Sequence, residues 1–135
     1  MNFLAPWSAQ FLSLMRIVFA LAFLQHGLAK HVGIPHVAMF DQLTLFAWPF
    51  GIAGIIEIVF GILLLVGLWT RIAAFILSGE MAIAYFWFHI PNNFYPLLNG
   101  GESAVLFCFG FLYLAAAGGG PWAVDALMGQ KTANA

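Results

Sequence analysis

The chain contains four long runs of apolar residues, and polar residues, glycine and proline gather in the segments between them. A helix needs about 20 apolar residues to cross a bilayer, and the runs predict helices over residues 7–28, 45–69, 72–89 and 102–117. Within each run the apolar positions are continuous, whereas a transmembrane β-barrel requires alternation of polar and apolar residues. The pattern therefore predicts an all-α integral membrane protein.

The segments between the runs predict the order of the helices in the bundle. Little more than residues 69–71 separates the second run from the third, which requires an antiparallel hairpin. The other two connections, residues 30–44 and 89–101, are longer and richer in polar groups, and they belong on the opposite side of the membrane. We predict one domain over residues 1–135, folded as a four-helix bundle with up-down-up-down topology.

The composition predicts a surface that faces lipid. Hydrophobic residues make up 64% of the 135 residues and charged residues only 7%, whereas about 25% are charged in a typical soluble domain. The net charge of -1 gives no basic surface for nucleic acid, so the bilayer is the expected partner.

Basic residues near membrane ends favour the cytoplasm. Arg71 and Lys131 share a side with the termini, against Lys30 on the other, so both termini are expected in the cytoplasm.

Three ionisable residues fall inside the apolar runs: Arg16, Glu57 and Glu80. Charged residues in such positions are rare and mark functional sites by default. The helical rise of about 1.5 Å per residue places the three at similar depth, and a buried arginine needs a partner because it does not lose its proton. We expect an inner polar cluster in which Arg16 pairs with Glu57, Glu80 or both. Such a cluster either fixes the helix register or forms the wall of a polar pocket.

A second polar group is expected near the outer face, where His26 ends the first run, His89 ends the third and Glu102 begins the fourth. These side chains are expected to meet a dense aromatic segment at residues 85–88, which could line a pocket for a planar ligand such as a quinone. Anchoring at the membrane interface is the commoner role of such aromatic residues. Histidine donates hydrogen bonds and protons near neutral pH. Glu102 also suits a simpler role, because an acidic residue in the first turn of a helix complements the helix dipole.

Other chemistry has less support in the sequence. His26, His31 and His36 recur every five residues, which does not place them on one helical face, and no metal site is predicted. A haem held by His26 and His89 requires both at one depth, and we rank it below a quinone. Cys108 is the single cysteine, so the chain alone cannot form an internal disulfide and is not expected to be a stand-alone disulfide oxidase.

An ordered set of polar, glycine and proline residues runs through nearly the whole chain: Arg16, His26, Gly27, Lys30, Glu57, Gly61, Gly67, Thr70, Arg71, Gly79, Glu80, Met81, Ala82, Pro96, Asn99, Gly100, Gly101, Glu102, Gly118, Gly120, Pro121, Trp122 and Asp125. This set resembles the DoxX family of small bacterial membrane proteins. Ala123 stands where the family usually has serine. The resemblance implies four transmembrane helices in a bacterial inner membrane, in agreement with the apolar runs.

The resemblance implies less about activity. Relatives in the family are associated with a thiosulfate:quinone oxidoreductase and with membrane complexes that handle oxidative or thiol stress. With the polar residues inside the apolar runs, this favours a membrane subunit of a redox system, which binds a quinone or anchors a soluble redox partner protein. The alternative is a non-enzymatic membrane scaffold or a small-solute permeation protein. The sequence leaves open whether the chain is catalytic alone and whether it forms a homo-oligomer.

Overall fold

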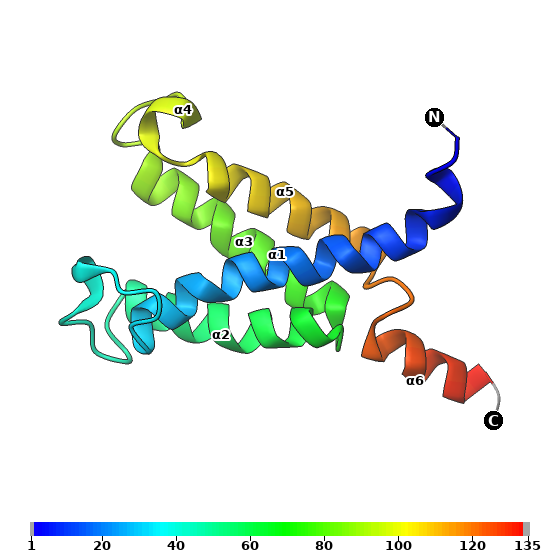
Figure 1. The fold of residues 1–135 in the computed structure, drawn as a ribbon. Coiled ribbons are helices and arrows are strands. Elements are labelled where there is room, and N and C mark those ends of the chain that lie inside the picture. The colour runs from blue at the N-terminus through cyan, green and yellow to red at the C-terminus, as the bar shows by residue number, and fades with distance from the viewer. Residues whose placement is uncertain (1, 134–135) are drawn as a thin grey trace.

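The computed structural model describes residues 2–133, with side chains for residues 2–129, and all regular structure in this range is helical (Figure 1). The six α-helices of the described range are α1 (Ser8–His31), α2 (Phe50–Val66), α3 (Thr70–Ala84), α4 (Pro96–Asn99), α5 (Glu102–Ala117) and α6 (Val124–Ala133). The other helical segments are short 3-10 turns at Ala5–Trp7 and Ala38–Phe40 and a π-helical turn at Tyr85–His89. The predicted all-α class is confirmed.

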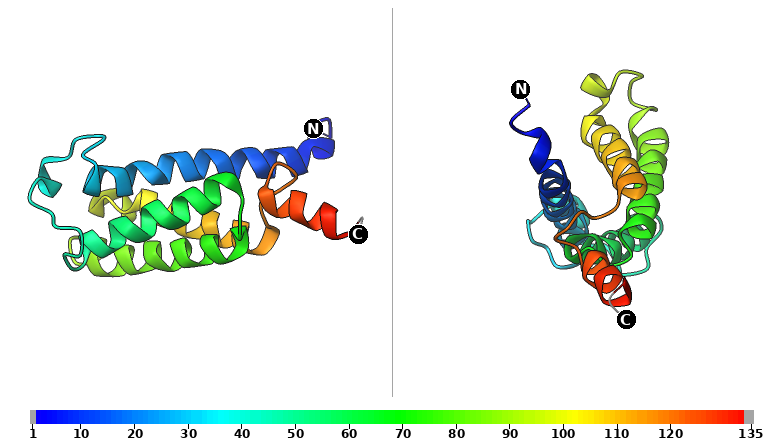
Figure 2. Two further views of the ribbon diagram at one scale, coloured as in Figure 1. Left: turned by 90° about the horizontal axis from the view of Figure 1, so that it is seen from below. Right: turned by 90° about the vertical axis from the view of Figure 1, so that its right-hand side faces the viewer.

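Four long helices build the bundle. Helix α1 packs along α2, α3 packs along α5, and contact between α2 and α3 joins the two pairs. Figure 2 shows these four helices side by side, with α6 projecting beyond them. The fully buried apolar side chains between the helices include Phe23, Leu64, Leu77 and Phe111. Phe23 and Phe111 meet edge to face with ring centroids 5.0 Å apart, a geometry that favours aromatic packing.

The outward faces of these helices are also apolar. Phe75 on α3 is 65% exposed and Leu106 on α5 is 69% exposed, and large apolar side chains are exposed on α1 and α2 as well. Extended apolar surface marks a protein or membrane contact. Two helical segments, Ala5–His31 and Thr70–His89, are long and apolar enough to cross a membrane, and α2 and α5 are shorter apolar helices.

The helix boundaries differ from the prediction where proline and glycine intervene. The second helix was expected from residue 45, but α2 begins at Phe50, directly after Pro49. It ends at Val66 because Gly67 follows with φ of 75°, a left-handed conformation that glycine adopts without a Cβ penalty. The fourth predicted helix, residues 102–117, coincides with α5. Helices α4 and α6 lie in segments that were expected to be loop or tail.

The bundle has two different ends (Figure 1). At one end, which we call the terminal end, the start of α1, the turn between α2 and α3, and α6 lie together. At the other, the loop end, lie the long connection of residues 32–49 and helix α4. Lys131 belongs to α6, but its side chain lies outside the described residues. Charged side chains are found at both ends of the bundle, and they make different kinds of contact at the two ends.

Candidate functional site

Two glycines bring α1 and α2 into close contact near the loop end. A Cβ atom added to Gly27 would lie 2.9 Å from the carbonyl oxygen of Gly54, and one added to Gly54 would lie 2.6 Å from Nε2 of His31. Small residues of this kind let helix backbones approach one another in membrane proteins. His31, at the end of α1, makes a second contact with α2: its Nε2 lies 2.7 Å from the carbonyl oxygen of Gly51.

The close approach places Lys30 of α1 against Glu57 of α2. The Nζ atom of Lys30 donates to both carboxylate oxygens of Glu57, at 2.7 Å and 2.6 Å. The side chains are only 9% and 4% exposed, so the ion pair is buried. A buried charge is costly unless it is paired and hydrogen-bonded, and each partner here removes that cost for the other.

This ion pair forms part of the wall of a cavity of about 150 Å³, which we call the histidine cavity. Its lining comes from α1, α2, α3 with its π-helical turn, and α5: His26, Lys30, Glu57, Met81, Ala84, His89, Ser103, Ala104 and Phe107. His26 is exposed, which places it at the mouth, and its ring lies 6.1 Å from the ring of Phe107, edge to face. The structure therefore brings the two predicted histidines into one site and adds Lys30 and Ser103.

The segment after the π-helical turn fixes the position of His89. Its Nδ1 lies 3.0 Å from the carbonyl oxygen of Asn99, and its ring stacks on Tyr85. The Asn99 side chain accepts a hydrogen bond from the N–H of Gly101 at 2.7 Å, while Gly100 takes a positive φ of 71°. The Asn99-Gly100-Gly101 sequence thus forms the turn that holds His89 from outside the cavity.

Glu102, the third residue expected at this site, is the first residue of α5 and is exposed. It does not line the histidine cavity, whose polar group on α5 is the next residue, Ser103. The position of Glu102 in the first turn agrees with the simpler role of complementing the helix dipole.

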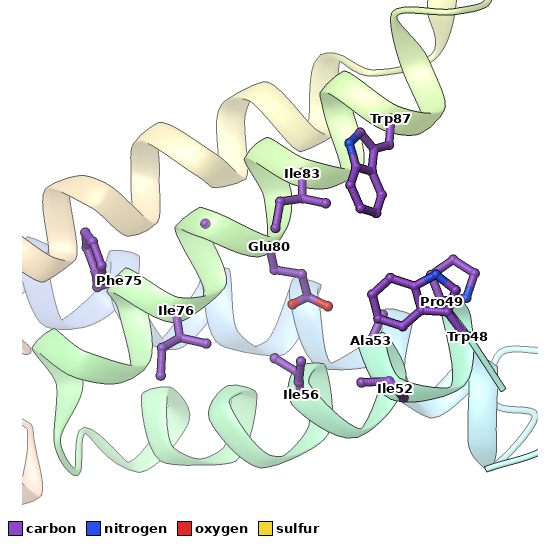
Figure 3. Close-up of a pocket in the computed structure, with 11 residues that line it drawn as sticks. Trp48, Pro49, Ile52, Ala53, Ile56, Phe75, Ile76, Glu80, Ile83 and Trp87 are labelled. Carbon is purple, nitrogen blue, oxygen red and sulfur yellow. The ribbon is translucent and has the colours of Figure 1, made fainter. Parts of the chain in front are cut away.

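The expected cluster of Arg16, Glu57 and Glu80 is not formed. Glu57 pairs with Lys30, and Glu80 lines a separate cavity of about 370 Å³ between α2 and α3 (Figure 3). Both carboxylate oxygens of Glu80 are buried and have no hydrogen-bond partner among the described residues. The charges of Glu57 and Lys30 act on Glu80 electrostatically, so the two carboxylates are neighbours without sharing a bond.

Arg16 is fully buried at the terminal end, where main-chain carbonyl groups surround it. Its guanidinium donates to Leu64 at 2.7 Å, to Leu65, to Gly119 at 3.0 Å and to Trp122 at 2.8 Å. The first two carbonyls belong to the last turn of α2, where carbonyl groups lack helical partners and the dipole attracts a cation. The predicted pairing of Arg16 with a glutamate is therefore wrong: its fork of donors is satisfied by main-chain oxygens instead.

Two further charged residues cap helices at the same end. Arg71 donates to the carbonyls of Ala115, at 3.1 Å, and Ala116, in the last turn of α5. Asp125 accepts hydrogen bonds from the N–H groups of Trp69 and Thr70, at 2.8 Å and 2.9 Å, where α3 begins. Each charge has the sign that complements the helix terminus it meets.

The pKa of Asp125 is lowered from its ordinary value. Burial acts to raise it, but the main-chain hydrogen bonds from Thr70 and Trp69 and the positive charge of Arg16 outweigh that effect. Sequence reasoning did not assign these capping roles. The signal that could have revealed them is the position of Asp125 shortly after Gly118-Gly119-Gly120 and of Arg71 shortly after Gly67, the glycines that end α5 and α2.

The histidines outside the cavity are engaged separately. His36 lies 2.9 Å from Asp41 in the exposed loop, and His31 contacts Gly51 as described. Within the described part of the chain, no group of three or more histidine, cysteine, aspartate or glutamate side chains has the arrangement of a metal site.

A helical bundle with apolar outer faces and ionisable groups inside defines a membrane-associated class of protein. Comparison of sequences is more specific, because the DoxX family model matches residues 11–90. The chain is also similar to an uncharacterized protein of Haemophilus influenzae, with 45% identity over 134 residues that cover 93% of this chain and 96% of that protein. No solved structure matches. The chain belongs to the DoxX family.

Proposed function

We propose that this protein crosses the bacterial inner membrane four times, with both termini in the cytoplasm, and serves as a membrane subunit or anchor of a redox system. In this proposal the histidine cavity binds the head group of a quinone. The observation that carries it is the meeting of two imidazoles, a buried Lys30–Glu57 ion pair and the aromatic ring of Phe107 in one cavity near the loop end.

The size and lining of the cavity suit a small aromatic head group. A cavity of about 150 Å³ is on the scale of those known to take a benzene ring. A porphyrin is far larger than such a cavity. Phe107 offers an aromatic edge, and Met81 and Ala84 add apolar contact. A quinone head group needs hydrogen-bond donors at its carbonyl oxygens, and it supplies two-electron, two-proton chemistry when it is bound.

Each polar residue of the cavity has a defined role in this proposal. The Nδ1–H of His89 donates to the Asn99 carbonyl, so its Nε2 is the nitrogen left to contact a ligand. His26, exposed at the mouth, exchanges protons with the surroundings. Lys30 holds the Glu57 carboxylate through two hydrogen bonds, and the pair makes its part of the cavity wall polar. Ser103 supplies a hydroxyl group from α5.

The experiment is a titration of the purified protein in lipid nanodiscs with short-chain ubiquinone and menaquinone analogues, followed by quenching of tryptophan fluorescence. His26→Ala and His89→Ala should each weaken binding by about three- to tenfold, the value of one hydrogen bond. His36→Ala is the matched control, because His36 lies in the exposed loop, and its affinity should equal that of the wild type.

Two results would reject parts of the proposal. If the wild type binds no quinone at concentrations found in membranes, the redox role fails and the scaffold or permeation alternative replaces it. If binding occurs but neither histidine substitution changes it, the redox role is retained and the histidine cavity is not the site. Co-purification of a soluble dehydrogenase would separately support the anchoring role.

A further inference from the structure

The cavity between α2 and α3 has a composition unlike that of the histidine cavity. Its volume is about 370 Å³ and its lining is apolar apart from Glu80. Figure 3 shows the Glu80 carboxylate pointing from α3 towards α2, with Ile56 and Ala53 across the cavity. Pockets of about this size take drug-sized organic molecules, and a few polar groups set their specificity.

Glu80 carries hydrogen-bonding capacity that the protein does not use. Both of its carboxylate oxygens are buried without a partner among the described residues. An unsatisfied buried polar group calls for an explanation, and a missing ligand is one. A carboxylate in this position is stabilised most by a positive charge.

No side chain supplies that charge within the described range. Lys30 is committed to Glu57 through two short hydrogen bonds. Arg16 and Arg71 donate to main-chain carbonyls at the terminal end. Lys30 is paired with Glu57, and the carboxyl group of Glu80, on the neighbouring helix, has no cation within bonding distance among the described residues.

Two tryptophans stand at the loop end of the same cavity. The rings of Trp48 and Trp87 are 6.4 Å apart and nearly edge to face, and Figure 3 shows both beside Glu80. The face of an indole ring attracts organic cations, most strongly where water is excluded. A carboxylate and two indole rings around an apolar volume are groups suited to a positive charge on a lipophilic molecule.

We propose that this cavity binds a lipophilic organic cation, such as an ammonium ion with alkyl or aryl groups, which enters from the lipid. The charge lies at Glu80, and the apolar groups contact Ile56, Ile83 and the two tryptophans. A lipid acyl chain alone would leave the carboxylate unsatisfied. A bare metal ion is disfavoured because hard cations require several oxygen ligands, and among the described residues that line the cavity Glu80 alone carries a carboxylate.

The test uses two probes of the same shape and opposite charge, tetraphenylphosphonium and tetraphenylborate. Binding of each to the full chain in zwitterionic nanodiscs is measured by equilibrium dialysis, with empty nanodiscs to subtract partition into lipid. The wild type should bind tetraphenylphosphonium saturably and should not bind tetraphenylborate saturably. Glu80→Gln should reduce tetraphenylphosphonium affinity at least about tenfold, while Glu102→Gln, on an exposed glutamate outside the cavity, should leave it unchanged.

Further variants keep the test decisive. Glu80→Asp retains the charge and should keep more affinity than Glu80→Gln, and Trp48→Leu should weaken binding where Trp122→Leu does not. Melting curves check that each variant is folded. Equal affinity of Glu80→Gln and wild type, or saturable binding of both probes, would overturn the proposal. His26→Ala and His89→Ala should not affect tetraphenylphosphonium, so failure here is independent of the quinone result.

Discussion

The ammonium group of Lys30 lies 2.6 Å from Oε2 of Glu57, and this contact ties α1 to α2 inside the bundle. It depends on the close approach of the two helices at Gly27 and Gly54, where a Cβ atom would meet backbone or side-chain atoms of the other helix. The same pair lines the histidine cavity. A single structural contact therefore supports both the packing of the helices and the polarity of the proposed site.

Removal of one partner of this ion pair should be more harmful than removal of both. Lys30→Met or Glu57→Leu alone leaves a buried charge uncompensated, and each should lower the free energy of unfolding by about 3–5 kcal/mol. The double variant should recover much of that loss. Reversible unfolding in mixed micelles gives the three values, and the coupling energy follows from the double-mutant cycle.

The exposed pair of His36 and Asp41 is the matched control for this cycle. Its side chains are 69% and 53% exposed, and exposed ion pairs contribute less than about 1 kcal/mol. Strict additivity of the Lys30 and Glu57 substitutions would show that the two side chains do not interact in the folded protein.

Arg16 should behave as a helix-capping residue. Arg16→Leu removes the guanidinium hydrogen bonds to the carbonyls of Leu64, Leu65, Gly119 and Trp122, and hydrogen bonds to a charged group are worth about 1.5–3 kcal/mol each. A loss of several kcal/mol in unfolding free energy is expected. Arg16→Lys should recover only part of it, because lysine lacks the planar fork that reaches several acceptors at once.

Two double variants test whether Arg16 caps a helix or pairs with a glutamate. They combine Arg16→Leu with Glu57→Leu and Arg16→Leu with Glu80→Leu. Because Arg16 contacts neither glutamate, the second substitution should not restore stability. Recovery of most of the lost free energy in either double variant would mean that Arg16 does pair with that carboxylate.

Asp125 should make the stability of the terminal end depend on pH. Its pKa in the folded protein lies below the ordinary value because main-chain N–H groups of α3 stabilise the carboxylate. The stabilisation that Asp125 contributes to the folded protein is therefore complete above the pKa of an aspartate in the unfolded chain, about 3.9. It is lost as the pH falls below that value and through the lower pKa of Asp125 in the folded protein.

Melting temperatures of the wild type and Asp125→Asn, recorded from about pH 7 down to about pH 3, test this dependence. The wild type should be the more stable protein at neutral pH, and the difference should shrink at the acidic end. Asp41→Asn provides a control on an exposed carboxylate. A difference that is constant with pH, or that grows as the pH falls, would contradict the capping role.

The sequence predicted the features that depend on apolar runs and on turn residues. The end of α5 follows from Gly118-Gly119-Gly120-Pro121. The hairpin between α2 and α3 was predicted from a short connection at residues 69–71, which lies at residues 67–69 in the structure. His26 and His89 were grouped because both were expected to end long helices on the same side, and both line the histidine cavity, although α1 continues to His31.

The partners of the charged residues could not be predicted in the same way. Similar depth suggested that Arg16 meets Glu57, but depth does not determine which face of a helix a side chain occupies. Arginine is also satisfied by carbonyl groups at a helix end, and a sequence does not show which carbonyls are left free. The Lys30–Glu57 contact depends on the close approach of helices at Gly27 and Gly54, which becomes visible only in three dimensions.

Fusions to alkaline phosphatase test the proposed topology. The enzyme is active only outside the cytoplasm, so a fusion after Lys131 should be inactive and a fusion within residues 30–44 should be active. The start of α1 and α6 lie at the same end of the bundle (Figure 1), so a fusion before Ser8 should match the one after Lys131. The reverse pattern would invert the orientation, and opposite results for the two terminal fusions would contradict four crossings.

The proposed quinone site is tested most directly by labelling. A photoreactive azidoquinone is added to the protein in nanodiscs, illuminated, and the labelled peptides are identified by mass spectrometry. The account predicts labels on the parts of α1 and α5 that line the histidine cavity, around His26 and Phe107, with labelling suppressed by excess unlabelled quinone and reduced in His89→Ala. Labels confined to the Glu80 cavity near Trp48 and Trp87, or labels that excess quinone does not suppress, would contradict it.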